Sequence, residues 1–194
     1  TKMEGNNKNM ASILKKDVSG EKLEVIKNFT EKGTFTNYKI ELPYMREELF
    51  ASCHSLTLCG GKATGDSLEQ EIFNNVGWRI EDVLSQDNSY KTIINNPDIP
   101  GLKLGVAVQF DFSSELQRMS VITQKVSDVQ LNAYRVYCKG SPEKIIPLCI
   151  SSTVPADILH VMKSYTCMGL RVIALAGKST TINSIQTYNR DQAE

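Results

Sequence analysis

The chain has no excess of either charge and no long apolar run. Its 194 residues include 22 Lys and Arg and 22 Asp and Glu, so the formal net charge is zero. Proteins that bind duplex nucleic acid neutralise many phosphates with basic side chains, and this balance therefore argues against nucleic acid as a partner. No apolar run approaches the roughly 20 residues that a transmembrane helix needs, so no direct membrane contact is predicted.

Histidine is scarce, and the cysteines are not paired along the chain. There are two histidines, His54 and His160, and an odd number of cysteines without CxxC spacing. Neighbouring residues on a helix point in different directions, so Cys53 and His54 do not predict a metal site without a second pair of ligands. Free thiols in a reducing cytosol are the expected state. The five cysteines are Cys53, Cys59, Cys138, Cys149 and Cys167.

The motifs of self-sufficient enzymes are also missing. GGKAT has no Ser or Thr directly after Lys62, and GKS near residue 178 has Val172 where a phosphate-binding loop requires glycine. There is no GxSxG motif and no plausible Ser/His/Asp set. We therefore expect no catalysis by this chain alone, which disfavours a free-standing soluble enzyme.

The pattern of apolar residues predicts one α+β domain. Several β-like runs follow one another through short turns, which favours an antiparallel-rich sheet of six to seven strands flanked by helices. Helices are expected at residues 44–54, 66–77, 142–149 and 155–168. Strands are expected at residues 78–84, 90–94, 104–110, 119–124, 133–138 and 170–176, with shorter β-like patches at 23–26 and 35–40. Residues 1–20 are expected to form an extended entry segment or a loop, and residues 178–194 are expected to leave the domain.

Two stretches, FDFSSELQRMSV and YCKGSPE, contain the main candidates for a binding site. Phe112 precedes a turn that begins at Ser113, and Lys139 ends a strand before Gly140. An aromatic face beside a cation suits a planar, anionic ligand such as a nucleotide. On pattern alone, a core position for Phe112 and a solvated position for Lys139 are the more common alternatives.

Three further charged residues have both a functional and a structural interpretation. Arg171 is expected inside an apolar strand, where a charge needs a partner, solvent or an anionic ligand. A position at the edge of the sheet, with the charge reaching solvent, explains it equally well. Asp66 and Glu69 lie three residues apart on one helix face, but acids in a first turn commonly just complement the helix dipole.

The order of these motifs resembles the nucleotide-binding (N) domain of P-type ATPases. The forms FSSxLQRMSV, KGSPExIxxLC and YTxxGxRVIALAxK look like the P5 branch, and are most similar to its P5B, polyamine-transporter-like subgroup. The upstream string CHSLTLCGGKATGDSLEQEIFNNVGW is similar to that family's CHSL…GDPxxxxMFxxTGW segment. The resemblance covers about residues 46–178.

The resemblance implies a nucleotide-binding role for the residues in these motifs. It implies that Phe112, with Ser113 beside it, stacks on adenine. It places Lys139 on the adenine and ribose side, Gly140 beside the base, and Arg171 near the ribose and phosphates.

Three other positions match the same family pattern. Asp66 and Glu69 are expected to reach the adenine edge, with Glu69 the better match. Met119 is expected to pack near the base.

The resemblance further implies one domain of a longer membrane ATPase. Residues 1–20 would come from a phosphorylation domain, with Thr1 ending its DKTGTLT signature. Residues 21–178 would form the nucleotide-binding domain, and residues 179–194 would return to the phosphorylation domain. ATP would be held by its adenine end and its γ-phosphate delivered to an aspartate of that other domain, where most Mg²⁺ contacts would lie.

The implied partners are the phosphorylation and actuator domains of the parent protein. The parent would be a multi-pass protein with this domain on the cytosolic face of an endolysosomal or vacuolar membrane, and its cargo class would be polyamines. Nothing in this chain would read the cargo.

Ser67 replaces a proline of the family pattern, which leaves the start of the helix less fixed. Ser114 and Gln117 stand where ion-pumping branches often carry basic residues, and these two substitutions near Phe112 keep a second hypothesis open. The alternative is an interaction or regulatory module of the same fold with weak or lost nucleotide binding. For a binding domain, one stacking platform and few phosphate contacts predict a dissociation constant of roughly 0.1–5 mM.

Overall fold

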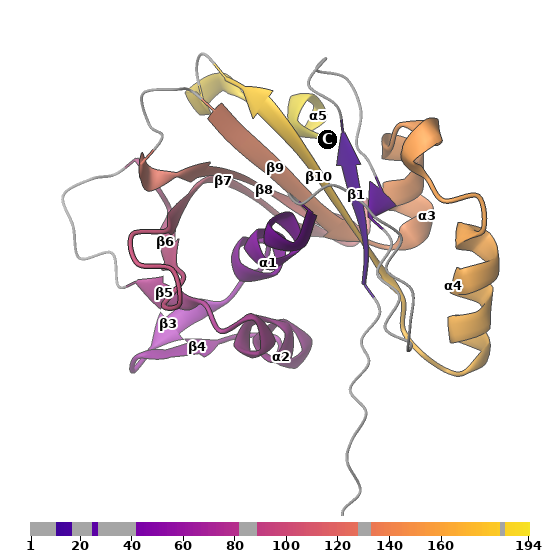
Figure 1. Ribbon diagram of the computed structural model, residues 1–194, viewed down its shortest axis with the longest axis horizontal. Helices are drawn as coiled ribbons and strands as arrows, with labels where there is room; N and C mark the ends of the chain where they lie inside the picture. Colours follow the sequence, from indigo (N-terminus) through magenta and orange to yellow (C-terminus); the bar gives the residue numbers. More distant parts are fainter. Residues whose placement is uncertain (1–10, 17–24, 27–41, 82–88, 128–132, 183–184) are drawn as a thin grey trace, which may run out of the picture.

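The computed structural model describes residues 11–16, 25–26, 42–81, 89–127, 133–182 and 185–194. They form an eight-stranded sheet in the order β2-β1-β10-β9-β8-β7-β6-β5 and a separate hairpin of β3 and β4 (Figure 1). The strands are β1 Ala11–Lys16, β2 Val25–Ile26, β3 Thr57–Cys59, β4 Lys62–Thr64, β5 Arg79–Glu81, β6 Thr92–Asn95, β7 Lys103–Ser113, β8 Arg118–Lys125, β9 Ala133–Gly140 and β10 Ile173–Thr181. The predicted α+β, antiparallel-rich fold is confirmed.

The six strands from β10 to β5 pair antiparallel throughout, which matches the predicted number. The two additional strands precede them in the chain. Residues 1–20 were expected as an extended entry segment or a loop, and Ala11–Lys16 instead forms a strand that pairs parallel with β10. Val25–Ile26, within the β-like patch expected at residues 23–26, then pairs with β1. The patch expected at residues 35–40 lies outside the described residues.

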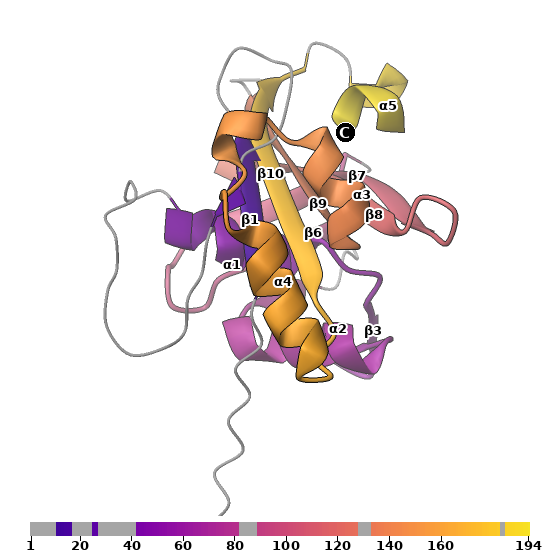
Figure 2. The same ribbon diagram turned by 90° about the vertical axis from the view of Figure 1, so that its right-hand side faces the viewer.

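Helices cover both faces of the sheet (Figures 1 and 2). The helices are α1 Leu42–Ser52, α2 Ser67–Val76, α3 Pro142–Ile145, α4 Ile158–Cys167 and α5 Arg190–Ala193, with 3₁₀ turns η2 Ile146–Leu148, η3 Ser151–Thr153 and η4 Ile185–Thr187. All four predicted helices are present, although α4 begins three residues later than expected. In the described ranges, no helix is both long and apolar enough to cross a membrane.

Alternation along β9 separates two hydrophobic cores. Tyr137 packs in the larger core with Met45 of α1 and Phe73 of α2. Cys138, which points the other way, packs with Ile145 of α3 in a second core. Because side chains alternate along a strand, Arg135 and Lys139 share the Tyr137 face.

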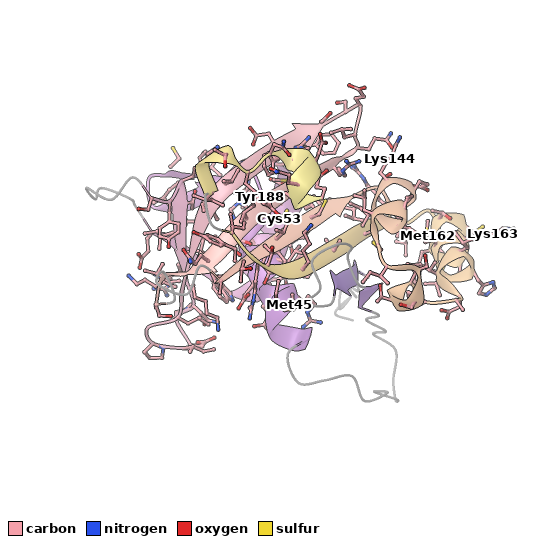
Figure 3. The ribbon with its side chains drawn as sticks, turned by 90° about the horizontal axis from the view of Figure 1, so that it is seen from above. Met45, Cys53, Lys144, Met162, Lys163 and Tyr188 are labelled. Atoms are coloured by element: carbon pink, nitrogen blue, oxygen red, sulfur yellow. The ribbon has the colours of Figure 1, made fainter. Side chains whose placement is uncertain are left out.

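The C-terminal residues pack against the sheet, so the expectation that residues 178–194 leave the domain is wrong. β10 continues to Thr181, and Lys178 is buried with its Nζ donating to the carbonyl of Gln192. Ala193 of α5 is fully buried in a third core with Val136. Seen from above, Tyr188 and Met45 of α1 lie on opposite sides of the sheet (Figure 3). Whether residues 179–194 lead back to a phosphorylation domain stays a prediction.

The strand predicted at residues 170–176 is displaced towards the C-terminus. β10 begins at Ile173, so Arg171 precedes it and is exposed. Gly169, with a φ of 76°, ends the preceding helix, and the chain enters the sheet only after three more residues. Arg171 is therefore not a charge buried in an apolar strand.

Candidate functional site

An ion pair between Lys139 and Glu69 joins two segments that are 70 residues apart. The Nζ of Lys139 lies 2.5 Å from Oε1 of Glu69, and the two side chains are 16% and 14% exposed. The other oxygen, Oε2, accepts a hydrogen bond of 2.9 Å from the backbone N–H of Ser55. The end of strand β9 and the first turn of helix α2 thus bring a cation and a carboxylate together.

Asp66 fixes the start of α2 and thereby the position of Glu69. Its Oδ1 accepts hydrogen bonds from the backbone N–H groups of Leu68 and Glu69, at 3.0 and 3.1 Å. This is an N-cap, which satisfies donors that have no partner within the helix. The structural interpretation of Asp66 is confirmed. A direct contact of Asp66 with a nucleotide is a separate matter and stays a prediction.

Phe112 lies near the same end of the sheet as this pair, on β7, with β8 between it and Lys139 on β9. Met119 of β8 is directly opposite Lys139 on β9 and is 1% exposed. Strand β7, on the other side of β8, has a bulge at this level. Phe110 pairs with Ser120 and Ser113 with Arg118. The two residues between them on β7, Asp111 and Phe112, therefore oppose the single residue Met119 on β8. Phe112 is 58% exposed.

The exposure of Phe112 rules out one of its two interpretations, while its role in stacking stays a prediction. A core residue of this size would lose most of its contact with water, so the core interpretation of Phe112 is wrong. The bulge sets the backbone of Phe112 opposite Met119, which in turn pairs with Lys139 on the next strand.

The turn after Phe112 reaches across to the start of α3. The hydroxyl of Ser113 accepts a hydrogen bond from the N–H of Leu116. Gln117 has a φ of 51°, and its carbonyl accepts the N–H of Ser141 at 2.9 Å. A Cβ on Gly140 would lie 2.4 Å from that carbonyl oxygen. Glycine at this position therefore permits the close approach of another part of the chain, a reason that the sequence did not reveal.

Arg171 lies at the same end of the sheet but outside this cluster. It precedes Ile173 by two residues, and Ala174 is the next residue and pairs with Gly140. In the part of the chain that the structure describes, no hydrogen bond or ion pair joins Arg171 to Lys139 or Glu69. Its guanidinium group remains available to solvent or to a bound anion.

His54 supports the site from behind, which sequence reasoning missed. Its Nε2–H donates to the carbonyl of Ala51 at 2.8 Å, and its Nδ1 accepts the N–H of Leu56 at 3.2 Å. Both contacts require the neutral ring with its proton on Nε2. Burial lowers the pKa of His54 to about 4. The ring braces the turn that directs the N–H of Ser55 towards Glu69, a role that only the three-dimensional arrangement reveals.

Cys53 packs under the site as an inert thiol. Its Sγ lies 3.8 Å from the carbonyl oxygen of Met119 and 4.0 Å from that of Tyr137. Burial raises the pKa of Cys53 to about 12, so the nucleophilic thiolate is scarce at neutral pH. Over the described ranges, no group of three or more His, Cys, Asp or Glu side chains is arranged to hold a metal ion.

Comparison with known proteins identifies the family. The family model "P-type ATPase, cytoplasmic domain N" matches residues 104–194, which include the bulge, the Lys139 strand and the C-terminal helix. The chain belongs to the P-type ATPases and is their cytoplasmic N domain.

The similar curated proteins define the branch. The chain is 39% identical over 143 residues to the human protein "Probable cation-transporting ATPase 13A5", and the matched region covers 70% of this chain and 12% of that protein. It is 33% identical over 172 residues to human "Polyamine-transporting ATPase 13A3", with 74% of this chain and 14% of that protein covered. It is 38% identical over 142 residues to "Probable cation-transporting ATPase catp-6" of Caenorhabditis elegans, with 69% of this chain and 11% of that protein covered. These relatives place the chain in the P5 branch, and it spans about an eighth of their length.

Proposed function

We propose that this domain binds ATP by its adenine end at the site formed by Phe112, Met119, Lys139 and Glu69. One observation supports this most strongly: an exposed aromatic side chain on β7 shares one end of the sheet with a partly buried cation–carboxylate pair. The ring offers a stacking face, and stacking of a base on an aromatic side chain contributes about 1–3 kcal/mol. The carboxylate of Glu69 can accept the adenine amino group, and Lys139 complements negative charge on the ligand.

The remaining candidates extend this proposal towards the rest of the nucleotide. Ser113 and Gly140 belong to the two turns that meet beside the pair, and Asp66 holds the helix that carries Glu69. Arg171 is exposed at the same sheet end, where it can meet ribose or phosphate oxygens. Oε1 and Oε2 of Glu69 accept from Lys139 and Ser55, and each oxygen keeps a second lone-pair site that can accept from the adenine amino group.

At the level of the parent protein, we propose a P5B-like transport ATPase. In this role the domain delivers the γ-phosphate to an aspartate of a separate phosphorylation domain, which would hold most of the Mg²⁺. Besides that domain, an actuator domain would be a partner. The name of relative 13A3 supports polyamines as cargo. A multi-pass parent in an endolysosomal or vacuolar membrane, with this domain on its cytosolic face, completes the proposal.

An NMR titration of the chain with ATP, with and without Mg²⁺, tests the binding site. We expect saturable shifts at Phe112, Lys139 and Arg171, little dependence on Mg²⁺, and a dissociation constant of roughly 0.1–5 mM. Phe112→Ala should abolish the saturation. Leu159→Ala, which also removes an exposed apolar side chain but on α4, should bind like the wild type.

Flat spectra up to about 10 mM ATP, well above the expected dissociation constant, would contradict this proposal. That result would favour an interaction or regulatory module of the same fold. Detectable ATP hydrolysis by the chain alone would contradict the expectation that catalysis needs the phosphorylation domain.

A further inference from the structure

The C-terminal helix α5 is attached to the bulge that carries Phe112. The guanidinium Nη2 of Arg190 donates to the backbone carbonyl of Asp111 at 2.5 Å. The same guanidinium lies over the ring of Phe110, 5.6 Å from its centroid. Arg190 therefore contacts the two residues that directly precede Phe112.

A single carboxylate completes this attachment. Glu194 lies with its Oε2 2.6 Å from Nε of Arg118 and its Oε1 2.5 Å from Oγ of Ser120. Its Oε1 is also 3.5 Å from Nε of Arg190. The side chain of Glu194 is 2% exposed, and those of Arg118 and Arg190 are 15% and 18% exposed. Buried charges are costly unless they are paired, so these contacts hold the three side chains in one arrangement.

These contacts surround the bulge on both strands. Asp111 precedes Phe112 on β7, while Arg118 and Ser120 flank Met119 on β8. A bulge interrupts the hydrogen-bond ladder, so the backbone at Phe112 has fewer strand partners to define it. Arg190 supplies a hydrogen bond at this interruption.

We propose that Arg190, held by Glu194, is a positioning residue for the nucleotide site. It fixes the β7 bulge so that the Phe112 ring is presented beside Lys139. Nucleotide binding and the attachment of α5 are then coupled: ATP tightens α5, and release of α5 weakens ATP binding. This inference rests on the proposed function and adds a residue that contacts the site only through the backbone of β7.

The test compares Arg190→Gln with Lys103→Gln in ATP titrations of the whole chain. Both variants remove one positive charge, and Lys103 lies at the other end of β7 in an exposed pair with Glu81. We expect the ATP dissociation constant to rise roughly threefold to tenfold in Arg190→Gln, the range of coupling carried by residues outside a site. We expect no change in Lys103→Gln. Arg190→Lys keeps the charge but not the fork of donors, and should give an intermediate value.

Hydrogen exchange provides the reciprocal measurement in the wild type. Saturating ATP should slow exchange at the amides of Gln192 and Ala193 by a similar factor, because coupling between two binding events is mutual. If Arg190→Gln shows no cooperative unfolding and is therefore not folded, the ATP affinity of Arg190→Lys and the hydrogen-exchange measurement test the positioning role instead.

The outcomes separate the two claims. If the wild type does not bind ATP, the proposed function fails. If the wild type binds ATP but both Arg190 variants bind it equally well and α5 exchange is unchanged, the positioning role is wrong and the proposed function stands.

Discussion

Strand β9 forms two cation–carboxylate pairs on one face, and they differ in what surrounds them. At its beginning, Arg135 pairs with Glu48 of α1. Four residues later, Lys139 pairs with Glu69 of α2. The side chain of Glu48 is 3% exposed, whereas that of Glu69 is 14% exposed.

The second partner of each carboxylate marks the difference. The hydroxyl of Tyr137 donates to the same oxygen of Glu48 that Arg135 contacts, at 2.6 Å. Burial, followed by the charge of Glu48, raises the pKa of Tyr137 well above its usual value, so the phenol remains a donor. Glu69 instead meets the N–H of Ser55. Similar ion pairs thus serve the core at one end of β9 and an accessible site at the other.

The largest expected effect follows from removing the buried carboxylate. Glu48→Ala leaves Arg135 without its partner and Tyr137 without an acceptor, and should lower the free energy of unfolding by about 3 kcal/mol. ATP affinity of the folded fraction should not change. Urea denaturation measures the first quantity, and Glu47→Ala on the same helix should stay within about 0.5 kcal/mol of the wild type. A loss in Glu47→Ala as large as in Glu48→Ala would contradict the role of the pair.

Acid should weaken the site end of the larger core through His54. Its pKa is about 4 in the folded chain against an ordinary 6.5, so the unfolded chain takes up its proton first as the pH falls. The full stability is present above pH 6.5 and is lost as the pH falls through 4. This loss amounts to roughly 3 kcal/mol, at about 1.4 kcal/mol for each pKa unit.

Denaturation curves between pH 7.5 and 4 measure this dependence. His54→Gln should be less stable at pH 7.5 but should show a shallower decline than the wild type. If the free energy of unfolding falls equally steeply with pH in the two proteins, His54 is not the cause of the loss of stability in acid.

Gly140→Ala tests the contact between the two turns at the site end. The added Cβ would meet the Gln117 carbonyl at 2.4 Å, and the overlap should cost about 2 kcal/mol of stability. It should also displace the turn after Phe112 and weaken ATP binding. Gly101→Ala provides a comparison, because its Cβ would meet no atom within 4 Å although its φ of 86° strains it. Unchanged ATP affinity in a folded Gly140→Ala variant would contradict the link between the turns and the site.

The smallest effect is expected at a third ion pair, between Lys103 and Glu81. Their side chains are 44% and 28% exposed, and such pairs contribute about 0–1 kcal/mol. The hydrogen bond from Lys103, followed by that from Asn95, lowers the pKa of Glu81. Thermal unfolding of Lys103→Gln should therefore differ little from the wild type, and the difference should shrink further in high salt. A loss of stability above about 1 kcal/mol that does not depend on salt would contradict the expectation that an exposed ion pair contributes little.

Most of the fold could be predicted because local patterns determine it. Asp66 and Gly77 bound α2, which matches the helix expected at residues 66–77, and Gly77 has the left-handed φ of 72°. β7, β8 and β9 follow from their β-branched and aromatic runs. The parallel pairing of β1 and the packing of α5 were not predictable in this way, because they depend on partners distant in the chain. The polar tail of residues 185–194 contains few apolar residues, yet Ile185, Tyr188 and Ala193 pack in the third core, and polar contacts of Arg190 and Glu194 add to this attachment.

The candidate site was only partly predictable for the same reason. The resemblance selected Phe112, Lys139 and Glu69, and the structure brings the last two into contact. The contacts of His54 and Arg190 were missed, because both side chains bond to backbone groups, His54 within three residues and Arg190 at Asp111, 79 residues earlier. Such contacts leave no spacing signature in the sequence.

ATP titration of Lys139→Gln and Arg135→Gln, side by side, tests the central contrast most directly. Both substitutions remove one positive charge from the same face of β9. The dissociation constant should rise at least about tenfold in Lys139→Gln, or about 1.4 kcal/mol, and stay unchanged in the folded fraction of Arg135→Gln. Wild-type affinity in Lys139→Gln, or an equal loss in both variants, would contradict the assignment of the nucleotide site to the Lys139 end of β9.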